Sequence, residues 1–126
     1  MNTFLWILQI IFGINFLAVG VMHFIIPPGL PAPMSWMYDL STGLHIFAGT
    51  AEILAGFGLI LPGALKIKTW LTPLAAAGLV LVMIGAAVFH FQRGEFINIG
   101  LNTFFAALLA FLAYGRWKLL PLGEGD

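Results

Sequence analysis

The chain has 126 residues, of which 61% are hydrophobic and 8% charged, and its five basic side chains are balanced by five acidic ones. Soluble domains carry about 25% charged residues, so the composition excludes an ordinary soluble protein, and the zero net charge excludes a basic surface for nucleic acid. The chain has no cysteine, which excludes a disulfide framework and thiol redox chemistry.

The first predicted element is an apolar stretch from about residue 3 to residue 26, which Pro27-Pro28-Gly29 stops. It is long enough to cross a hydrocarbon core of about 30 Å, which takes about 20 residues. Because it lacks a basic n-region and is too long for the h-region of a signal peptide, we interpret it as a retained membrane helix. A loop over 27–42 follows, and its proline-rich and aromatic composition is compatible with a short interfacial helix.

Three further stretches have the length and composition of membrane helices: 43–61, 70–91 and 96–115. Ser41 or Thr42 is the expected N-cap of the first of these, and Pro62-Gly63 is its expected stop. We therefore predict an all-α, integral membrane four-helix bundle that forms a single transmembrane domain over 1–126, with 27–42 as its outer loop.

The distribution of basic residues predicts the orientation of this bundle. With four spans, one side carries both termini and most of the basic side chains: Lys66, Lys68, Arg116 and Lys118. The opposite side carries only Arg93. Cytoplasmic loops are enriched in Lys and Arg, so we expect both termini in the cytoplasm. We expect the membrane to be a bacterial cytoplasmic membrane. We interpret the four basic residues as topology determinants only.

Glu52 lies in the middle of the second span, with no Lys or Arg within a helical turn or two. A carboxylate at bilayer depth costs roughly 2.5–3.5 kcal/mol on insertion scales, and such a group usually faces the bundle interior. Glu52 is therefore the leading candidate for a functional residue. The alternative is that it makes one structural hydrogen bond between helices.

Other polar residues share the outer half of the predicted bundle with Glu52. His23 ends the first span, His45 opens the second, His90 ends the third, and Asn102 lies near the start of the fourth. His45 and Glu52 are seven residues apart, which is close to two helical turns, so they share a helix face about 10 Å apart. We predict that these residues form one ligand-binding polar core.

The predicted pocket opens toward the outer face, with the 27–42 loop as its roof and Glu52 as its floor. Its expected walls are aromatic and apolar: Phe16, Phe47, Met83 and Phe105. No two histidines on one helix have the spacing of metal ligands, so we predict no metal site. No nucleophile triad or phosphate-binding glycine loop is present, so no catalytic residue is assigned.

Several blocks in the chain match those of a known family: Trp6-Ile7-Leu8-Gln9-Ile10, Gly20-Val21-Met22-His23-Phe24, Gly49-Thr50-Ala51-Glu52, Gly58-Leu59-Ile60-Leu61-Pro62, Trp70-Leu71-Thr72-Pro73-Leu74-Ala75-Ala76, Gly85-Ala86-Ala87-Val88-Phe89-His90, Arg93-Gly94-Glu95 and Tyr114-Gly115-Arg116. Through these blocks the chain resembles the DoxX and DoxX-like family of small four-helix membrane proteins over nearly its whole length. The family name comes from a subunit of a thiosulfate:quinone oxidoreductase. The resemblance implies the fold, the membrane location and an association with redox chemistry.

Two functions follow from these features. In the first, the bundle binds a quinone-like or other lipophilic molecule in its outer half, as an accessory component of a quinone-linked oxidoreductase. That function needs no intrinsic cofactor beyond the quinone or lipid, and its partners are the bilayer and a membrane or surface-associated redox protein. In the second, the chain is a non-catalytic scaffold or assembly protein. The sequence leaves open whether any chemistry occurs and whether the chain forms a homo-oligomer, which transport would require.

Overall fold

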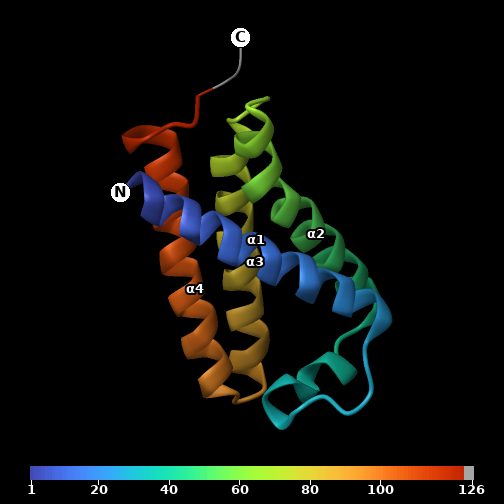
Figure 1. The fold of residues 1–126 in the computed structure, drawn as a ribbon. Helices are drawn as coiled ribbons and strands as arrows, with labels where there is room; N and C mark the ends of the chain where they lie inside the picture. The colour runs from blue at the N-terminus through green and yellow to red at the C-terminus, as the bar shows by residue number, and fades with distance from the viewer. Residues whose placement is uncertain (124–126) are drawn as a thin grey trace.

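A computed structural model describes residues 1–123, which form helices and no strand (Figure 1). The four long helices are α1 (Asn2–Ile25), α2 (Thr42–Leu65), α3 (Leu71–Gln92) and α4 (Phe96–Tyr114). Two short segments complete the fold: the 3-10 helix η1 (Ala32–Tyr38) and the π-helical turn η2 (Gly115–Leu119). The predicted all-α fold is confirmed, and the four long apolar helices make the chain an integral membrane protein.

The helices pack as two antiparallel pairs. α1 packs mainly on α2 and α3 mainly on α4, α2 and α3 have fewer contacts, and the backbones of α1 and α4 come close at only a few positions. In Figure 1, α1 crosses the bundle obliquely, and η1 lies at the opposite end from the N-terminus. We call these the η1 end and the terminal end. The shared core is apolar and draws on all four long helices, with residues such as Leu5, Phe12, Leu59, Leu79 and Leu109.

Glycines let the backbones of α1 and α2 approach closely. A Cβ added at Gly49 would lie 2.9 Å from the carbonyl oxygen of Gly20, and one added at Gly56 would lie 2.9 Å from that of Gly13. Small residues at helix interfaces permit such contacts in membranes, where no hydrophobic force drives helices together. These glycines therefore form a packing surface, and the crossing brings the η1 end of α1 against α2.

The predicted end of the second span at Pro62-Gly63 is wrong, because α2 continues through Pro62 to Leu65. A proline inside a helix removes one backbone donor, which leaves the carbonyl four residues earlier without its partner. Here that carbonyl belongs to Gly58, and the Thr72 hydroxyl of α3 donates to it at 2.8 Å. Gln9 of α1 donates its side-chain amide to the neighbouring Leu59 carbonyl, also at 2.8 Å. The Thr72 hydroxyl thus replaces the donor that Pro62 removes, so α2 can continue past the proline.

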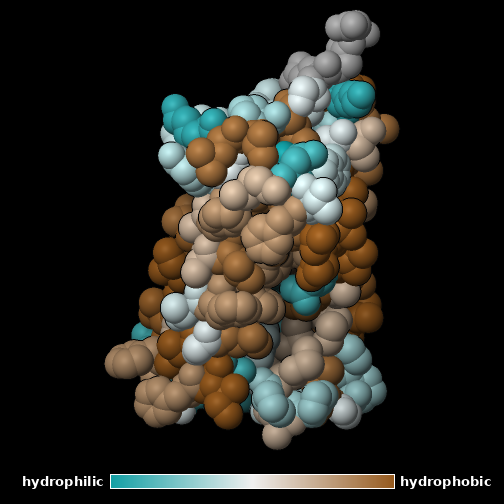
Figure 2. Space-filling view, turned by 60° about the vertical axis from the view of Figure 1, so that its left-hand side comes forward, coloured by the Kyte–Doolittle hydropathy of each residue, from teal (hydrophilic) through white to brown (hydrophobic). Residues whose placement is uncertain are grey.

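Large apolar side chains are exposed on every long helix, including Ile11, Leu54, Leu81 and Phe104. In Figure 2 the hydrophilic colours gather mainly toward the two ends of the molecule, and apolar colours cover most of the middle. Lipid is the environment in which such a surface is stable. The described chain thus has the surface of a membrane-embedded bundle.

The loop between α1 and α2 folds over the η1 end. The Tyr38 hydroxyl donates to the Pro27 carbonyl at 2.7 Å and accepts from the Leu30 backbone N–H at 3.0 Å. Arg93, between α3 and α4, donates to the Asp39 carboxylate at 2.9 Å. The loop is therefore closed on itself and tied to the opposite helix pair.

Candidate functional site

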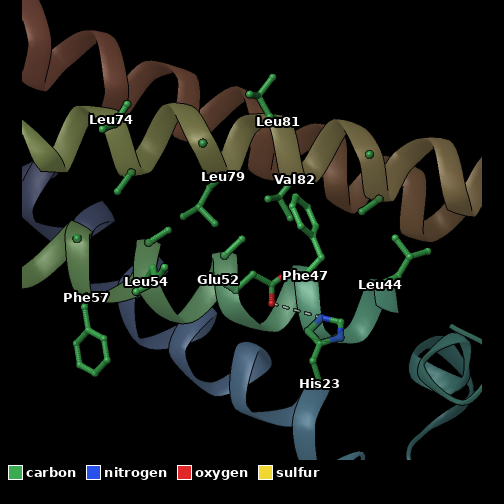
Figure 3. A pocket seen from close by; sticks show the side chains of 18 of the residues that line it. His23, Leu44, Phe47, Glu52, Leu54, Phe57, Leu74, Leu79, Leu81 and Val82 are labelled. Carbon is green, nitrogen blue, oxygen red and sulfur yellow. Dashed lines mark ion pairs between the residues drawn. The ribbon is translucent and has the colours of Figure 1, made fainter. Parts of the chain in front are cut away.

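A groove with a volume of about 930 Å³ lies between α2 and α3. These two helices contact each other less closely than α1 contacts α2 or α3 contacts α4. Its walls are mostly apolar, and Figure 3 shows Phe47 of α2 on one side with Leu79 and Val82 of α3 on the other. On α3 its lining residues extend from Leu71 to His90. At 1.5 Å per residue this is about 28 Å, close to the thickness of a hydrocarbon core of about 30 Å.

The groove differs from the predicted pocket in its walls. Of the four predicted wall residues, only Phe47 lines it. Phe16 and Met83 are buried in the core instead, and Phe105 packs edge-on against Phe12 with ring centroids 5.3 Å apart. The groove also extends beyond one half of the bundle, to Pro62 near the terminal end. Helix α4 supplies none of its lining, because α3 stands between α4 and the groove.

Glu52 lies on the wall of the groove beside His23 of α1, as Figure 3 shows. Glu52 Oε2 is 3.5 Å from His23 Nε2, and both side chains are buried. This oxygen makes no hydrogen bond with any described residue. Since buried polar atoms nearly always have a partner, an unpartnered carboxyl oxygen on a groove wall indicates a position where a ligand atom or an exchangeable proton belongs.

His45 joins the same cluster from the start of α2. Its Nδ1 is 2.9 Å from Nδ1 of His23, and its Nε2 is 2.8 Å from the carbonyl oxygen of Met37 in η1. All three polar side chains are at most 5% exposed. The structure therefore brings His23, His45 and Glu52 together, and it anchors them to the loop that covers the η1 end.

His90 lines the groove from α3, and Trp36 lies between it and His23. The Trp36 ring centroid is 5.2 Å from that of His90 and 6.0 Å from that of His23, and all three residues line the groove. His90 Nδ1 is 3.0 Å from Glu95 Oε1, whereas its Nε2 has no hydrogen bond with a described residue. The hydrogen bonds from Arg93 and then His90 hold the pKa of Glu95 below its usual value.

Asn102 lies apart from this cluster. It does not line the groove, and its buried Nδ2 makes no hydrogen bond with any residue that the structure describes. Its predicted depth alone did not fix the direction in which it points around the axis of α4. Of the five predicted residues, three lie together (His23, His45 and Glu52), His90 lines the facing α3 wall of the groove, and Asn102 lies apart.

Arg116 is buried, although the sequence predicted only a role in topology for it. It is 3% exposed at the terminal end, so its role is not confined to topology. Its guanidinium donates to Gln9 Oε1 at 2.6 Å, to Asn2 Oδ1 at 2.8 Å and to the Leu120 carbonyl at 3.0 Å. It also lies 5.7 Å from the centroid of the Trp6 ring. The sequence signal for this group of hydrogen bonds was Gln9, a polar side chain within the apolar run of α1.

Within residues 1–123, no group of three His, Asp or Glu side chains is arranged to hold a metal ion. The model of one protein family, described as the DoxX-like family, matches residues 7–112. Comparison with curated proteins and with solved structures returned no match.

Proposed function

From the premise that this chain belongs to the DoxX-like family, we propose that it binds a quinone-like or other lipophilic molecule in the groove between α2 and α3. In this proposal the protein is a component of a redox-linked membrane complex. The ligand and a partner protein hold the electrons, and the chain supplies the binding site. The observation that carries the proposal is the buried Glu52 carboxyl oxygen on the wall of a mostly apolar groove, which lies 3.5 Å from His23 and accepts no hydrogen bond from any residue of 1–123.

The size and shape of the groove support a lipophilic ligand. Small-molecule sites have volumes of about 300–1,000 Å³, with apolar walls and a few polar groups that fix orientation. The groove has about 930 Å³ and only a few polar residues on its walls. It opens sideways between α2 and α3, so a molecule dissolved in the bilayer would reach it without crossing the headgroup region.

The polar groups suit a ligand with oxygen atoms on a flat ring. A ligand carbonyl needs a hydrogen-bond donor, which the His23–Glu52 pair offers whenever it holds a proton. A ligand hydroxyl needs an acceptor, and neutral His90 offers its Nε2 because its Nδ1 faces the Glu95 carboxylate. A quinone has the first kind of oxygen and its reduced form the second. Trp36, between the two histidines, provides an aromatic face for the ring.

Two glycines of α3 permit a direct test, because they line the groove and a Cβ at either would meet nothing within 4 Å. Gly85→Leu and Gly78→Leu should fill the groove without disturbing the fold. Gly100→Leu on α4 is the matched control, since it is equally uncrowded and lies off the groove. The probe is a benzoquinone with a decyl chain, titrated into lipid nanodiscs while quenching of the fluorescence of the four tryptophans is followed.

We expect Gly85→Leu to weaken binding by at least about tenfold, since Gly85 lies near the polar residues, and we expect Gly100→Leu to bind like the wild type. A further Trp36→Phe variant should lose most of the quenching. If the wild type shows no saturable binding, or if all three leucine variants bind equally, then the groove is not the site. The scaffold function would then be the better account.

We also propose that the protein lies in a bacterial cytoplasmic membrane with both termini in the cytoplasm. The terminal end carries Lys66, Lys68 and Lys118, whereas Arg93 is the basic residue of the η1 end. Under this orientation the η1 end faces outward. A reporter fused after residue 126 that works only in the cytoplasm should be active, and activity of an export-dependent reporter at that position would refute the orientation.

A further inference from the structure

Three side chains and one carbonyl form a continuous polar chain from η1 to the groove. The Met37 carbonyl is 2.8 Å from His45 Nε2, His45 Nδ1 is 2.9 Å from His23 Nδ1, and His23 Nε2 is 3.5 Å from Glu52 Oε2. Both nitrogens of His45 are thus hydrogen-bonded, and His23 Nε2 faces the Glu52 carboxyl oxygen at ion-pair distance. Donors and acceptors can be assigned along this row of polar groups, because the Met37 carbonyl at its start can only accept a hydrogen bond.

The Met37 carbonyl fixes the first proton. A carbonyl only accepts hydrogen bonds, so His45 Nε2 must carry a hydrogen. If His45 Nδ1 also donated to His23, His45 would be a cation, with the whole His23 ring between it and the Glu52 carboxylate. Separating charges in this way is unfavourable in a low-dielectric interior. His45 is therefore neutral and accepts, and His23 Nδ1 is the donor.

The last step is the 3.5 Å approach of His23 Nε2 to Glu52 Oε2, and the buried cluster is neutral only if one proton lies between them, because an uncompensated buried charge is costly. His23 Nε2 and Glu52 Oε2 face each other, and the proton lies either on the carboxyl group or on the imidazole. The His45–His23–Glu52 cluster is neutral in both states, so the proton can occupy either atom without changing the net charge of the buried site. The remaining titratable residue on the groove wall, His90, is engaged through its Nδ1 with Glu95 and makes no hydrogen bond to this cluster.

We infer that His45 is a positioning residue for the groove: anchored by the Met37 carbonyl, it holds His23 in the form whose Nε2 shares one proton with Glu52. The inference deepens the proposed function, on which it rests for its ligand, because the shared proton is the donor that a ligand oxygen would meet. It also links the loop to the site. Displacement of η1 would remove the partner of His45 Nε2 and release His23 to donate from the other nitrogen.

Nitrogen-15 NMR of the ligand-free protein tests this directly, because the chain has only three histidines and single substitutions assign them all. Nitrogen shifts distinguish protonated from unprotonated ring nitrogens. We expect His45 to be protonated at Nε2 and unprotonated at Nδ1, and His23 to be protonated at Nδ1. We also expect a scalar coupling between the two Nδ1 atoms across their hydrogen bond. An unprotonated His23 Nδ1, or no coupling to His45, would overturn the inference.

Two substitutions of His45 separate positioning from packing. His45→Asn retains a side-chain oxygen that can accept from His23 Nδ1, whereas His45→Phe retains the ring volume without an acceptor. We expect His23 to stay protonated at Nδ1 in the first variant and to shift to the Nε2-protonated form in the second. Binding of the decyl benzoquinone should fall at least about tenfold in His45→Phe and less than about threefold in His45→Asn.

The two proposals fail separately. Identical His23 spectra in the wild type and in His45→Phe would overturn the positioning role even if the benzoquinone binds. The expected spectra in a protein that binds no benzoquinone would overturn the proposed ligand and leave the hydrogen-bonded chain standing. If His45→Phe does not fold, the wild-type coupling and the His45→Asn spectrum decide the inference without it.

Discussion

The hydrogen bond between Thr72 and the Gly58 carbonyl should be worth more than an ordinary bond between helices. Pro62 has no N–H, so it leaves the Gly58 carbonyl without its partner inside α2, and the Thr72 hydroxyl takes that place at 2.8 Å. A buried group left without a partner costs about 1–3 kcal/mol, whereas side-chain hydrogen bonds between membrane helices average about 0.6 kcal/mol. We therefore expect Thr72→Val to lower the free energy of unfolding by about 1–2 kcal/mol.

A double-mutant cycle isolates the proline. Pro62→Ala restores a backbone N–H at position 62, which can donate to the Gly58 carbonyl, so Thr72→Val should then cost about 0.5 kcal/mol or less. The expected coupling energy is about 1 kcal/mol, within the range for residues that share a partner. Unfolding by SDS in bicelles gives the four free energies.

Thr103→Val is the control for loss of a hydroxyl. Thr103 is exposed on α4 and donates to the Ile99 carbonyl of its own helix at 2.8 Å, so its replacement should change stability by less than about 0.5 kcal/mol. If Thr72→Val costs the same with and without Pro62, the carbonyl is not the reason for the hydrogen bond. Our account of how α2 passes the proline would then be wrong.

Three further substitutions test the helix crossing, the buried arginine and the loop. Gly49→Ala should destabilise the protein by about 1–3 kcal/mol in the same unfolding assay, because its Cβ would lie 2.6 Å from a ring carbon of Phe24, whereas Gly43→Ala meets nothing within 4 Å and should be neutral. Arg116→Lys should cost about 2–3 kcal/mol, since one ammonium cannot replace the several donors of the guanidinium. Hydrogen bonds hold the pKa of Glu95 below its usual 4.5, so the stability they contribute is present above pH 4.5 and lost as the pH falls through the folded-state value. The melting temperature should therefore decline less steeply in acid for Glu95→Gln than for the wild type, and equal slopes would contradict this.

The sequence predicted the helices well because membrane spans depend on a local property. Each span needs about 20 apolar residues, and three of the four predicted spans agree with the structure to within two residues. The predicted end of the second span was wrong because the effect of Pro62 was judged from the sequence of its own helix alone. The donor that compensates for it is the Thr72 hydroxyl of α3, and a rule applied to one segment cannot include partners on other helices.

The sequence predicted how deep in the membrane the site residues lie, and only partly which way their side chains point. Depth follows from counting residues along a helix, which is why His23, His45 and Glu52 could be grouped before their contacts were known. The direction in which a side chain points relative to the groove depends on how the helices cross, which the sequence does not give. For this reason the prediction missed that Asn102 lies off the groove. Arg116 was misjudged for a related reason, since a basic residue at the end of a span normally reaches the headgroups, and here it is buried against side chains from α1.

The central claim, that the groove between α2 and α3 holds a lipophilic ligand at Glu52, is tested most directly by native mass spectrometry of the protein released from its own membranes. We expect the wild type and Gly100→Leu to carry one small apolar molecule with oxygen atoms on a ring. We expect that molecule to be lost from Gly85→Leu, which fills the groove, and depleted in Glu52→Ala, which removes the polar contact. A wild type that carries only phospholipid, or a bound molecule retained equally by all four proteins, would contradict the account.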